Sequence, residues 1–179
     1  MNDICCIGHI TRDKIITPHH EAFISGGTAF YFSYAIARLP RKVSYQLVTK
    51  LGRYDVEEVK RMRDERIDVL AFTCDNSVYF ENRYEGDQNK RTQRVLSKCE
   101  PFKISEMNGI KAKVFHLGSL LNDDFSADFI RELSTRGRIS IDAQGFLREV
   151  RGQKVVAVDW EEKHKILKHT HTLKLNEHE

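Results

Sequence analysis

The side chains of this sequence that could do chemistry are carboxylates and amides placed just after predicted strands. Asp13 comes five residues after the apolar run at residues 4–8, and Asn176 and Glu179 follow a predicted strand at residues 170–175 that contains Leu173 and Leu175. In an open α/β sheet, ligands bind beyond the carboxyl ends of the strands. These three residues are therefore candidates for a ligand site, although a loop aspartate such as Asp13 is more often simply solvated.

Two glycines mark the start of a predicted helix. Gly26-Gly27-Thr28 stands directly before a stretch of apolar and aromatic residues, 28–39, whose apolar character nearly all round predicts a buried helix. The glycines could simply form a turn. Alternatively, their missing side chains let backbone N–H groups at a helix N-terminus approach a ligand. In that case Asp13 would share the same crevice.

Several catalytic and metal-binding motifs are absent from the sequence. It contains no Gly-x-Gly, no glycine followed by lysine and no Gly-x-Ser-x-Gly, which excludes dinucleotide, Walker A and hydrolase signatures. None of the four cysteines has Cys-x-x-Cys spacing, which argues against a zinc knuckle or a thioredoxin motif. His169 and His171 alternate on a predicted strand, so a structural pair is favoured over a zinc site.

Composition places the chain among globular proteins. Its 179 residues are 40% hydrophobic and 31% charged, with a net charge of only +3, and the basic residues are spread along the chain. This footprint predicts no nucleic-acid partner. The longest uncharged stretch, residues 22–37, is too short to span a membrane, and no signal peptide opens the chain. We therefore expect no membrane partner, a cytoplasmic location and reduced cysteines.

The elements that must position these side chains alternate between strand and helix. Continuous apolar runs predict buried parallel strands, and amphipathic or apolar stretches between them predict helices. This rhythm predicts an α/β fold with a parallel sheet. The expected strands are residues 4–8, 43–48, 114–117, 138–142 and 170–175, and the expected helices are residues 28–39, 55–66, 123–136 and 160–168.

The middle of the chain has a different pattern. Residues 77–84 and 91–96 alternate apolar and polar side chains around a turn at residues 85–87. Such alternation predicts an antiparallel hairpin with one wet face. Short runs at residues 14–17 and 22–25 could join it as a small second sheet.

Segments spread along the chain resemble the PfkB-type (ribokinase-like) carbohydrate kinases. "GHITRD", "SGGTAFYFSYAIARL", "FHLGSLL", "IDAQGFLR" and "LKLNEHE" occur in the order of that family, between residues 4 and 179. The resemblance covers the first half to two thirds of such a kinase. It implies a ribokinase-like parallel sheet flanked by helices, with a small antiparallel β lid from residues 14–25 and 68–98. It also implies that residues 1–179 form a partial domain, truncated before the nucleotide-binding half.

The resemblance implies roles for the candidate residues. Asp13, with Gly26, Gly27 and Thr28, would bind the sugar, because a carboxylate accepts hydrogen bonds from two vicinal hydroxyls. Asn176 and Glu179 match the motif that positions magnesium-bound water and the nucleotide phosphates, which implies ATP and Mg²⁺ as cofactors but no direct metal ligand. No catalytic residue is assigned, since the family's Gly-x-Gly-Asp base is absent from this sequence.

The resemblance implies a function, and a few residues that differ from the family bear on the substrate. The parent reaction would be ATP-dependent phosphorylation of a sugar or cyclitol hydroxyl, and we expect the 179-residue chain alone to be inactive. A non-catalytic sugar-binding or sensing module is the alternative. Tyr31 stands where the family usually has asparagine, Thr11 replaces another asparagine, and Gly118 replaces the glutamate of ribokinase itself, so ribose is disfavoured. The start of the 28–39 helix is more similar to the inositol-kinase branch. A small sugar or inositol is the expected partner, with a possible homodimer through the β lid.

Overall fold

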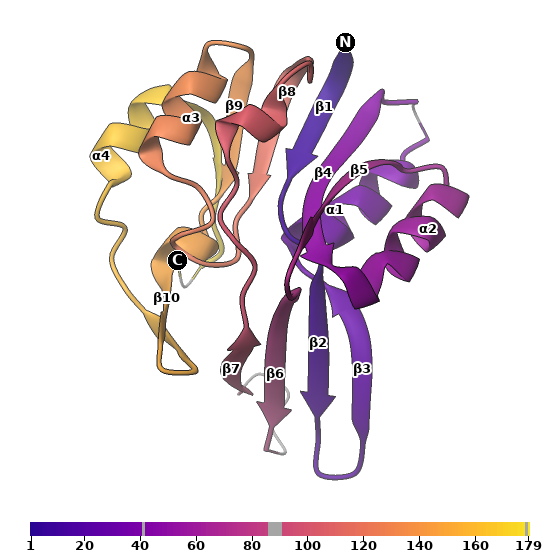
Figure 1. Ribbon diagram of the computed structural model, residues 1–179. Helices are drawn as coiled ribbons and strands as arrows, with labels where there is room; N and C mark the ends of the chain where they lie inside the picture. The colour runs from indigo at the N-terminus through magenta and orange to yellow at the C-terminus, as the bar shows by residue number, and fades with distance from the viewer. Residues whose placement is uncertain (41, 86–90, 178) are drawn as a thin grey trace.

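The computed structural model describes residues 1–40, 42–85, 91–177 and 179, which form two β-sheets. The first sheet has six strands in the order β12-β9-β8-β1-β4-β5, and every neighbouring pair is parallel (Figure 1). The predicted parallel core is therefore confirmed. Its strands are β1 (Asn2–Ile7), β4 (Tyr45–Gly52), β5 (Asp68–Cys74), β8 (Ala112–Gly118), β9 (Arg138–Asp142) and β12 (Thr170–Lys174).

Helices cover both faces of the first sheet. Adjacent residues of β1 point in opposite directions, so that Cys5 packs in one apolar cluster and Cys6 in another. The Cys5 cluster includes α3 and α4, whereas the Cys6 cluster includes α1 and α2. Burial on both faces explains why the run at residues 4–8 is continuously apolar. The helices are α1 (Thr28–Ala37), α2 (Val56–Asp64), α3 (Ala127–Ser134) and α4 (Lys163–Ile166).

Local sequence determines where α3 begins. The Ser126 hydroxyl accepts a hydrogen bond from the Phe129 N–H at 3.1 Å, which caps the helix. Phe129, Ile130 and Leu133 then repeat at helical spacing and are fully buried. Among the described residues, no helix is long and apolar enough to cross a membrane. Four short 3-10 helices complete the helical elements: η1 (Arg53–Asp55), η2 (Ile104–Met107), η3 (Gly145–Leu147) and η4 (Leu167–His169).

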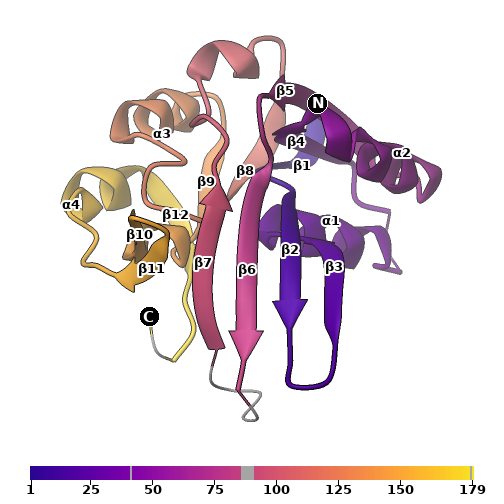
Figure 2. The same cartoon turned by 60° about the horizontal axis from the view of Figure 1, so that its bottom comes forward.

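The second sheet lies at one end of the first and has the order β10-β11-β7-β6-β2-β3 (Figures 1 and 2). The predicted hairpin forms from β6 and β7, and the two short early runs join it as β2 and β3, as expected. β2 and β6 are parallel, and the other pairs are antiparallel. Its strands are β2 (Thr11–Ile16), β3 (Glu21–Gly26), β6 (Val78–Tyr84), β7 (Arg91–Ser97), β10 (Arg148–Arg151) and β11 (Lys154–Ala157).

Two parts of this arrangement differ from the expected one. We expected residues 68–98 to belong to the lid, but Asp68–Cys74 is β5 of the first sheet and pairs with β4 over its whole length. The β10–β11 hairpin extends the second sheet and was not predicted. Only a loop through Gly145 was expected after the 138–142 strand, and no element was assigned to Arg148–Arg151 or Lys154–Ala157.

The two sheets are joined at a neck, formed by the segments that enter β6 and leave β7. A disulfide links Cys74, at the end of β5, to Cys99, just after β7. The Ser77 hydroxyl accepts a hydrogen bond from the Gly52 N–H at 2.7 Å and donates one to Asp55 at 2.6 Å. The expectation that all cysteines are reduced is therefore wrong for this pair. No sequence motif marks two cysteines that are 25 residues apart.

Two expectations about burial are also wrong. Only Ala29 and Ser33 of α1 are fully buried, and Tyr31 is 56% exposed, so one side of the helix is open. In β12, Leu173 is 37% exposed. The strand pairs only with β9 and forms the edge of the described sheet, so it is not the buried strand that its apolar residues predicted.

Candidate functional site

The N-terminus of α1 lies against the carboxyl ends of β1 and β8. A Cβ at Gly118 would come within 3.1 Å of the Ala29 backbone nitrogen, and one at Gly8 within 2.8 Å of the Ala29 Cβ. Gly27 precedes the helix with a φ of 97°, and a Cβ there would meet the His9 carbonyl oxygen at 2.6 Å. Glycine is required here by conformation and by space. The helix can start close to the sheet only because these positions lack side chains.

Asp13 projects from β2 beside the other glycine of the pair. A Cβ at Gly26 would lie 2.7 Å from Asp13 Oδ2 and 3.0 Å from Thr11 Oγ1. Asp13 Oδ1 and Thr11 Oγ1 are buried and have no hydrogen-bond partner among the described residues. Burial raises the pKa of the Asp13 carboxyl, although the Thr11 hydroxyl and the Arg91 charge act in the opposite direction. The structure thus brings Asp13, Gly26, Gly27 and the first helical residue, Thr28, to one place.

Asn176 and Glu179 meet in a turn after β12. The Asn176 N–H donates to Glu179 Oε2 at 3.0 Å, and the Glu179 N–H donates to the Asn176 carbonyl oxygen at 3.2 Å. Burial lowers the pKa of the nearby Arg148, and Arg91 adds to this effect, whereas the negative charges of Glu179 and Asp142 oppose it. The chain end therefore lies within electrostatic range of Arg148.

Two arginines, Arg91 and Arg148, act electrostatically on the residues around Asp13 or on those around Glu179. Sequence reasoning assigned neither arginine a role. Arg91, on β7, acts electrostatically on both Asp13 and Arg148. Arg148, the first residue of β10, ends the quoted segment "IDAQGFLR". The signal for Arg148 was its place after a buried strand. Arg91 had no local signal. It lies near Asp13 only because its strand, β7, pairs with β6, which in turn pairs with β2.

Tyr31 occupies the open side of α1 toward Asp13. Burial raises the pKa of the Tyr31 hydroxyl, and the charges of Asp13 and Tyr84 act in the same direction. Tyr31 is the residue that replaces the asparagine usual at this point of the PfkB-type signature. An aromatic hydroxyl therefore stands near the Asp13 carboxylate.

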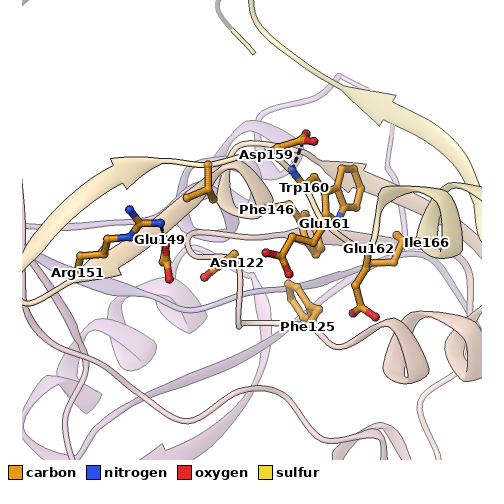
Figure 3. A pocket seen from close by; sticks show the side chains of 11 residues that line it. Asn122, Phe125, Phe146, Glu149, Arg151, Asp159, Trp160, Glu161, Glu162 and Ile166 are labelled. Carbon is orange, nitrogen blue, oxygen red and sulfur yellow. Dashed lines mark hydrogen bonds and ion pairs between the residues drawn. The ribbon is translucent and has the colours of Figure 1, made fainter.

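A cavity of about 350 Å³ lies elsewhere, between the β10–β11 hairpin and α4 (Figure 3). Phe146 and Trp160 stack in its wall with ring centroids 4.4 Å apart. Four of the other lining side chains are acidic, and three of these are paired with a nearby cation: Glu149 with Arg151, Asp159 with Lys163 and Glu162 with Lys165. The cavity contains none of the predicted site residues. A larger one, of about 600 Å³, lies beside β2 and β3 and is lined in part by Thr11 and Ser25.

The described residues offer no convincing metal centre. The one group of potential ligands found among them is Cys74, Cys99 and Glu100, and both sulfurs belong to the disulfide. His169 Nδ1 lies 3.3 Å from the Ser134 hydroxyl, and His171 Nδ1 accepts from the Ile139 N–H at 3.2 Å. These contacts support the structural histidine pair that the sequence favoured.

Comparison with known proteins finds similarity at the level of structure. No protein-family model and no curated protein matches the sequence. A pyrophosphate-dependent ribokinase-family kinase, complexed with a pyrophosphate analog and myo-inositol, superposes with a TM-score of 0.86 and 29% identity, covering 95% of this chain and 60% of that one. A pyrophosphate-dependent myo-inositol-1 kinase converted into a myo-inositol-3 kinase superposes with a TM-score of 0.84 and 27% identity. That match covers 95% of this chain and 58% of the other.

A more distant neighbour shows the fold alone. An uncharacterized sugar kinase from Pyrococcus horikoshii in complex with ATP has a TM-score of 0.61 and 17% identity, covering 78% of this chain and 52% of that one. This chain thus spans about 60% or less of the length of these solved proteins. Its parallel sheet flanked by helices matches theirs throughout the compared region. The chain has the fold of the ribokinase-like kinases.

Proposed function

We propose that this chain is the acceptor-binding part of a kinase that phosphorylates a hydroxyl of a cyclic polyol, with myo-inositol as the first candidate. The observation that carries the proposal is the Asp13 carboxylate near the start of α1: its Oδ1 is buried without a hydrogen-bond partner among the described residues, and its Oδ2 lies beside Gly26. The 29% identity to a kinase complexed with myo-inositol supports the choice of acceptor.

The chemistry of this corner suits a neutral polyol. An ionised carboxylate only accepts hydrogen bonds, and a polyol offers two neighbouring O–H donors to the oxygens of Asp13. Gly26 leaves space in front of Asp13 that any larger residue would fill. N–H groups at the start of α1 can donate to further hydroxyl oxygens. Asp13 would bind and orient the acceptor.

The cations and the chain end suit a phosphate donor. Arg91 and Arg148 could bind phosphate oxygens, because guanidinium groups form bidentate bonds with phosphate. Asn176 and Glu179 offer oxygen atoms that could hold a hydrated Mg²⁺ through its water, and such an ion would neutralise phosphate charge. The sequence suggests ATP as the donor, whereas the kinases at 27% and 29% identity use pyrophosphate. We favour pyrophosphate, to be tested against ATP.

One neighbour bears on which hydroxyl reacts. In that myo-inositol kinase, replacing an asparagine and a serine with leucine moves the phosphorylated position from 1 to 3. This chain has an asparagine and a glutamine at the same spacing, Asn82 and Gln93, in neighbouring strands of the second sheet. The second sheet would then act as a lid over the acceptor. Its suggested role in a homodimer and the cytoplasmic location stay predictions.

The test uses the full-length protein and two measurements. Calorimetric titration with myo-inositol should show binding that Asp13→Ala weakens by about 1.5–3 kcal/mol, the range for hydrogen bonds to charged groups. Asp64→Ala, an exposed aspartate at the end of α2, is the matched control and should bind normally. Product formation with pyrophosphate and with ATP then identifies the donor.

Two results would contradict the proposal or narrow it. Absence of binding across inositols and hexoses would reject the polyol site. Binding without phosphate transfer from either donor by the full-length protein would support the non-catalytic polyol-binding alternative. A protein of residues 1–179 only is expected to bind the acceptor but to transfer no phosphate, because its sequence lacks Gly-x-Gly-Asp.

A further inference from the structure

A buried histidine and a buried aspartate lie next to the candidate site with incomplete hydrogen bonding. His9 is fully buried, Asp124 is 4% exposed, and His9 Nε2 lies 3.6 Å from Asp124 Oδ1. Among the described residues, neither ring nitrogen of His9 has a hydrogen-bond partner of ordinary geometry. Buried polar groups are nearly always paired, so these two nitrogens need an explanation.

His9 belongs to the segment that carries Asp13. It lies where the chain passes from β1 of the first sheet to β2 of the second, four residues before Asp13 (Figure 1). A Cβ at Gly27 would meet the His9 carbonyl oxygen, so His9 packs against the start of α1. The next N–H, that of Ile10, donates to Thr49 Oγ1 at 3.1 Å. The position of His9 therefore helps to fix how Asp13 sits relative to the glycine turn.

Asp124 holds a loop that supports the second sheet. Its Oδ2 accepts hydrogen bonds from the N–H groups of Leu120 and Leu121 at 2.7 and 3.2 Å. Both leucines are buried in one cluster with Phe80, which is opposite Asp13 in the ladder of β2 and β6. The other oxygen of Asp124 faces the histidine. The two residues thus join the two segments that hold the Asp13 site.

The other charged groups around the pair have partners of their own or face solvent. They are Lys50 with Glu106, Lys98 with Asp123, and the exposed Glu100. The ring of Phe102 packs on the imidazole of His9, with centroids 4.7 Å apart. Asp124 is therefore the ionisable group that the imidazole faces directly.

One added proton would complete the hydrogen bonds of the pair. A neutral imidazole has one N–H and one bare nitrogen. The Lys50 backbone favours an N–H on its side of the ring, which leaves the bare nitrogen opposite the Asp124 carboxylate. A protonated carboxyl donates to that nitrogen, whereas an ionised one opposes it with a lone pair. Burial raises the pKa of Asp124 to about 7 and lowers the pKa of His9 to about 4, which places the proton on Asp124.

We propose that His9 and Asp124 share this proton as a positioning pair for the polyol site, and that losing it weakens polyol binding. The inference rests on the proposed function. The pair acts through the two segments that it joins and makes no contact with the polyol itself. Without the proton, the buried carboxylate and the ring no longer hold these segments together. Because linkage is reciprocal, polyol binding must then take up a proton from solvent as the pair begins to lose it.

The experiment is calorimetric titration of the full-length protein with myo-inositol between about pH 6 and about pH 9, in buffers with different heats of ionisation. It measures the dissociation constant and the number of protons taken up on binding. We expect the wild-type dissociation constant to rise about fivefold or more over this range, with proton uptake near neutral pH.

Asp124→Asn is the decisive variant, because its amide imitates the protonated carboxyl. It keeps one oxygen for the N–H groups of the loop and donates to His9 at every pH. It should bind as tightly as the wild type does at pH 6 and take up no proton near neutral pH. Asp128→Asn removes an exposed aspartate of α3 and is the matched control, with the wild-type profile. Ionisation of Asp13 is common to all three proteins and drops out of the comparison.

A structural role for the pair predicts parallel profiles. If the wild type and Asp124→Asn show the same pH dependence and the same proton uptake, the inference is overturned while the proposed function stands. If the wild type binds no polyol at any pH, the proposed function fails and the inference with it. If Asp124→Asn does not fold, His9→Gln takes its place, because its amide donates to an ionised carboxylate without an added proton. Loss of proton uptake in His9→Gln supports the shared proton, and persistence of the uptake overturns it.

Discussion

The two sheets of this protein are built on opposite principles. The first is wholly parallel, is covered by helices on both faces, and has fully buried residues such as Phe115 and Leu117 in its central strand β8. The second is mixed, and its outer face is open, with Arg12 stacked 5.2 Å from the Phe23 ring centroid. Its inner face carries Asp13, Asn82 and Arg91. Stability is concentrated in the first sheet, and recognition chemistry in the second.

The neck shows how the two principles are connected. Gly52, at the end of β4, and Ser77, just before β6, are hydrogen-bonded, and the Cys74–Cys99 disulfide ties the same two sheets together. The polar face of the second sheet is thus held over the carboxyl ends of the parallel strands. A sheet that carries partly unsatisfied polar groups can be kept in place by a core that carries none of the recognition chemistry.

The largest effect should come from truncating a buried side chain in the first sheet. Phe115→Ala removes a fully buried ring from β8 and should cost about 3–5 kcal/mol of unfolding free energy. Arg12→Ala on the open face of the second sheet loses only cation–π contacts and should cost less than about 1 kcal/mol. Urea denaturation of both variants measures the contrast. Equal costs would contradict the division between the sheets.

Breaking the neck should have the next largest effect. The double variant Cys74→Ser/Cys99→Ser removes a crosslink that closes a loop 25 residues long and should lower stability by about 3 kcal/mol. Hydrogen exchange should rise in β6 and β7 more than in β1 and β8, because the crosslink ends at the second sheet. The reduced wild-type protein is the control and should behave like the variant. Uniform acceleration in both sheets would show that the disulfide stabilises the whole fold instead.

Acid should weaken the first sheet through its buried histidines. Burial lowers the pKa of His9 and of His116 from 6.5 to about 4. Each histidine therefore lowers the unfolding free energy of the protein as pH falls from 6.5 to 4. Burial raises the pKa of Asp124 from 3.8 to about 7, so protonation of this carboxyl raises the unfolding free energy as pH falls over nearly the same range. His9 Nε2 and Asp124 Oδ1 are only 3.6 Å apart, so these two groups titrate together and their opposite effects largely offset each other, whereas His116 leaves a net loss of stability in acid. Urea unfolding between pH 7.5 and 4.5 checks this, and His116→Gln should remove most of the net loss.

The smallest effect on stability should come from replacing Asp13. The expected change in melting temperature is positive in the second sheet and negative for a matched aspartate of the first sheet. Burial raises the pKa of Asp13, so ionisation opposes folding above the unfolded pKa, and Asp13→Asn should raise the melting temperature at pH 7 while weakening polyol binding. Asp3→Asn is the control with the opposite sign, because Lys113 and the Ser44 N–H lower the pKa of Asp3. A lower melting temperature for Asp13→Asn would show that this carboxylate is structural.

The sequence predicted the elements whose signals are local. The continuous apolar run at residues 4–8 indicated a strand buried on both faces, and β1 is such a strand. The alternation at residues 77–84 and 91–96 indicated a hairpin, and β6 and β7 form it. β5 was missed as part of the parallel sheet, because it is an edge strand whose residues alternate between buried and exposed.

The sequence by itself determined the parallel core and the hairpin, because each depends on side-chain periodicity. Only the tertiary structure decided that Cys74 meets Cys99, that Asp13 lies beside Gly26, and that Asn82 and Gln93 face the side of Asp13. These outcomes depend on the register between strands distant in sequence. A shift of one residue would turn Asn82 to the opposite face without changing any local pattern.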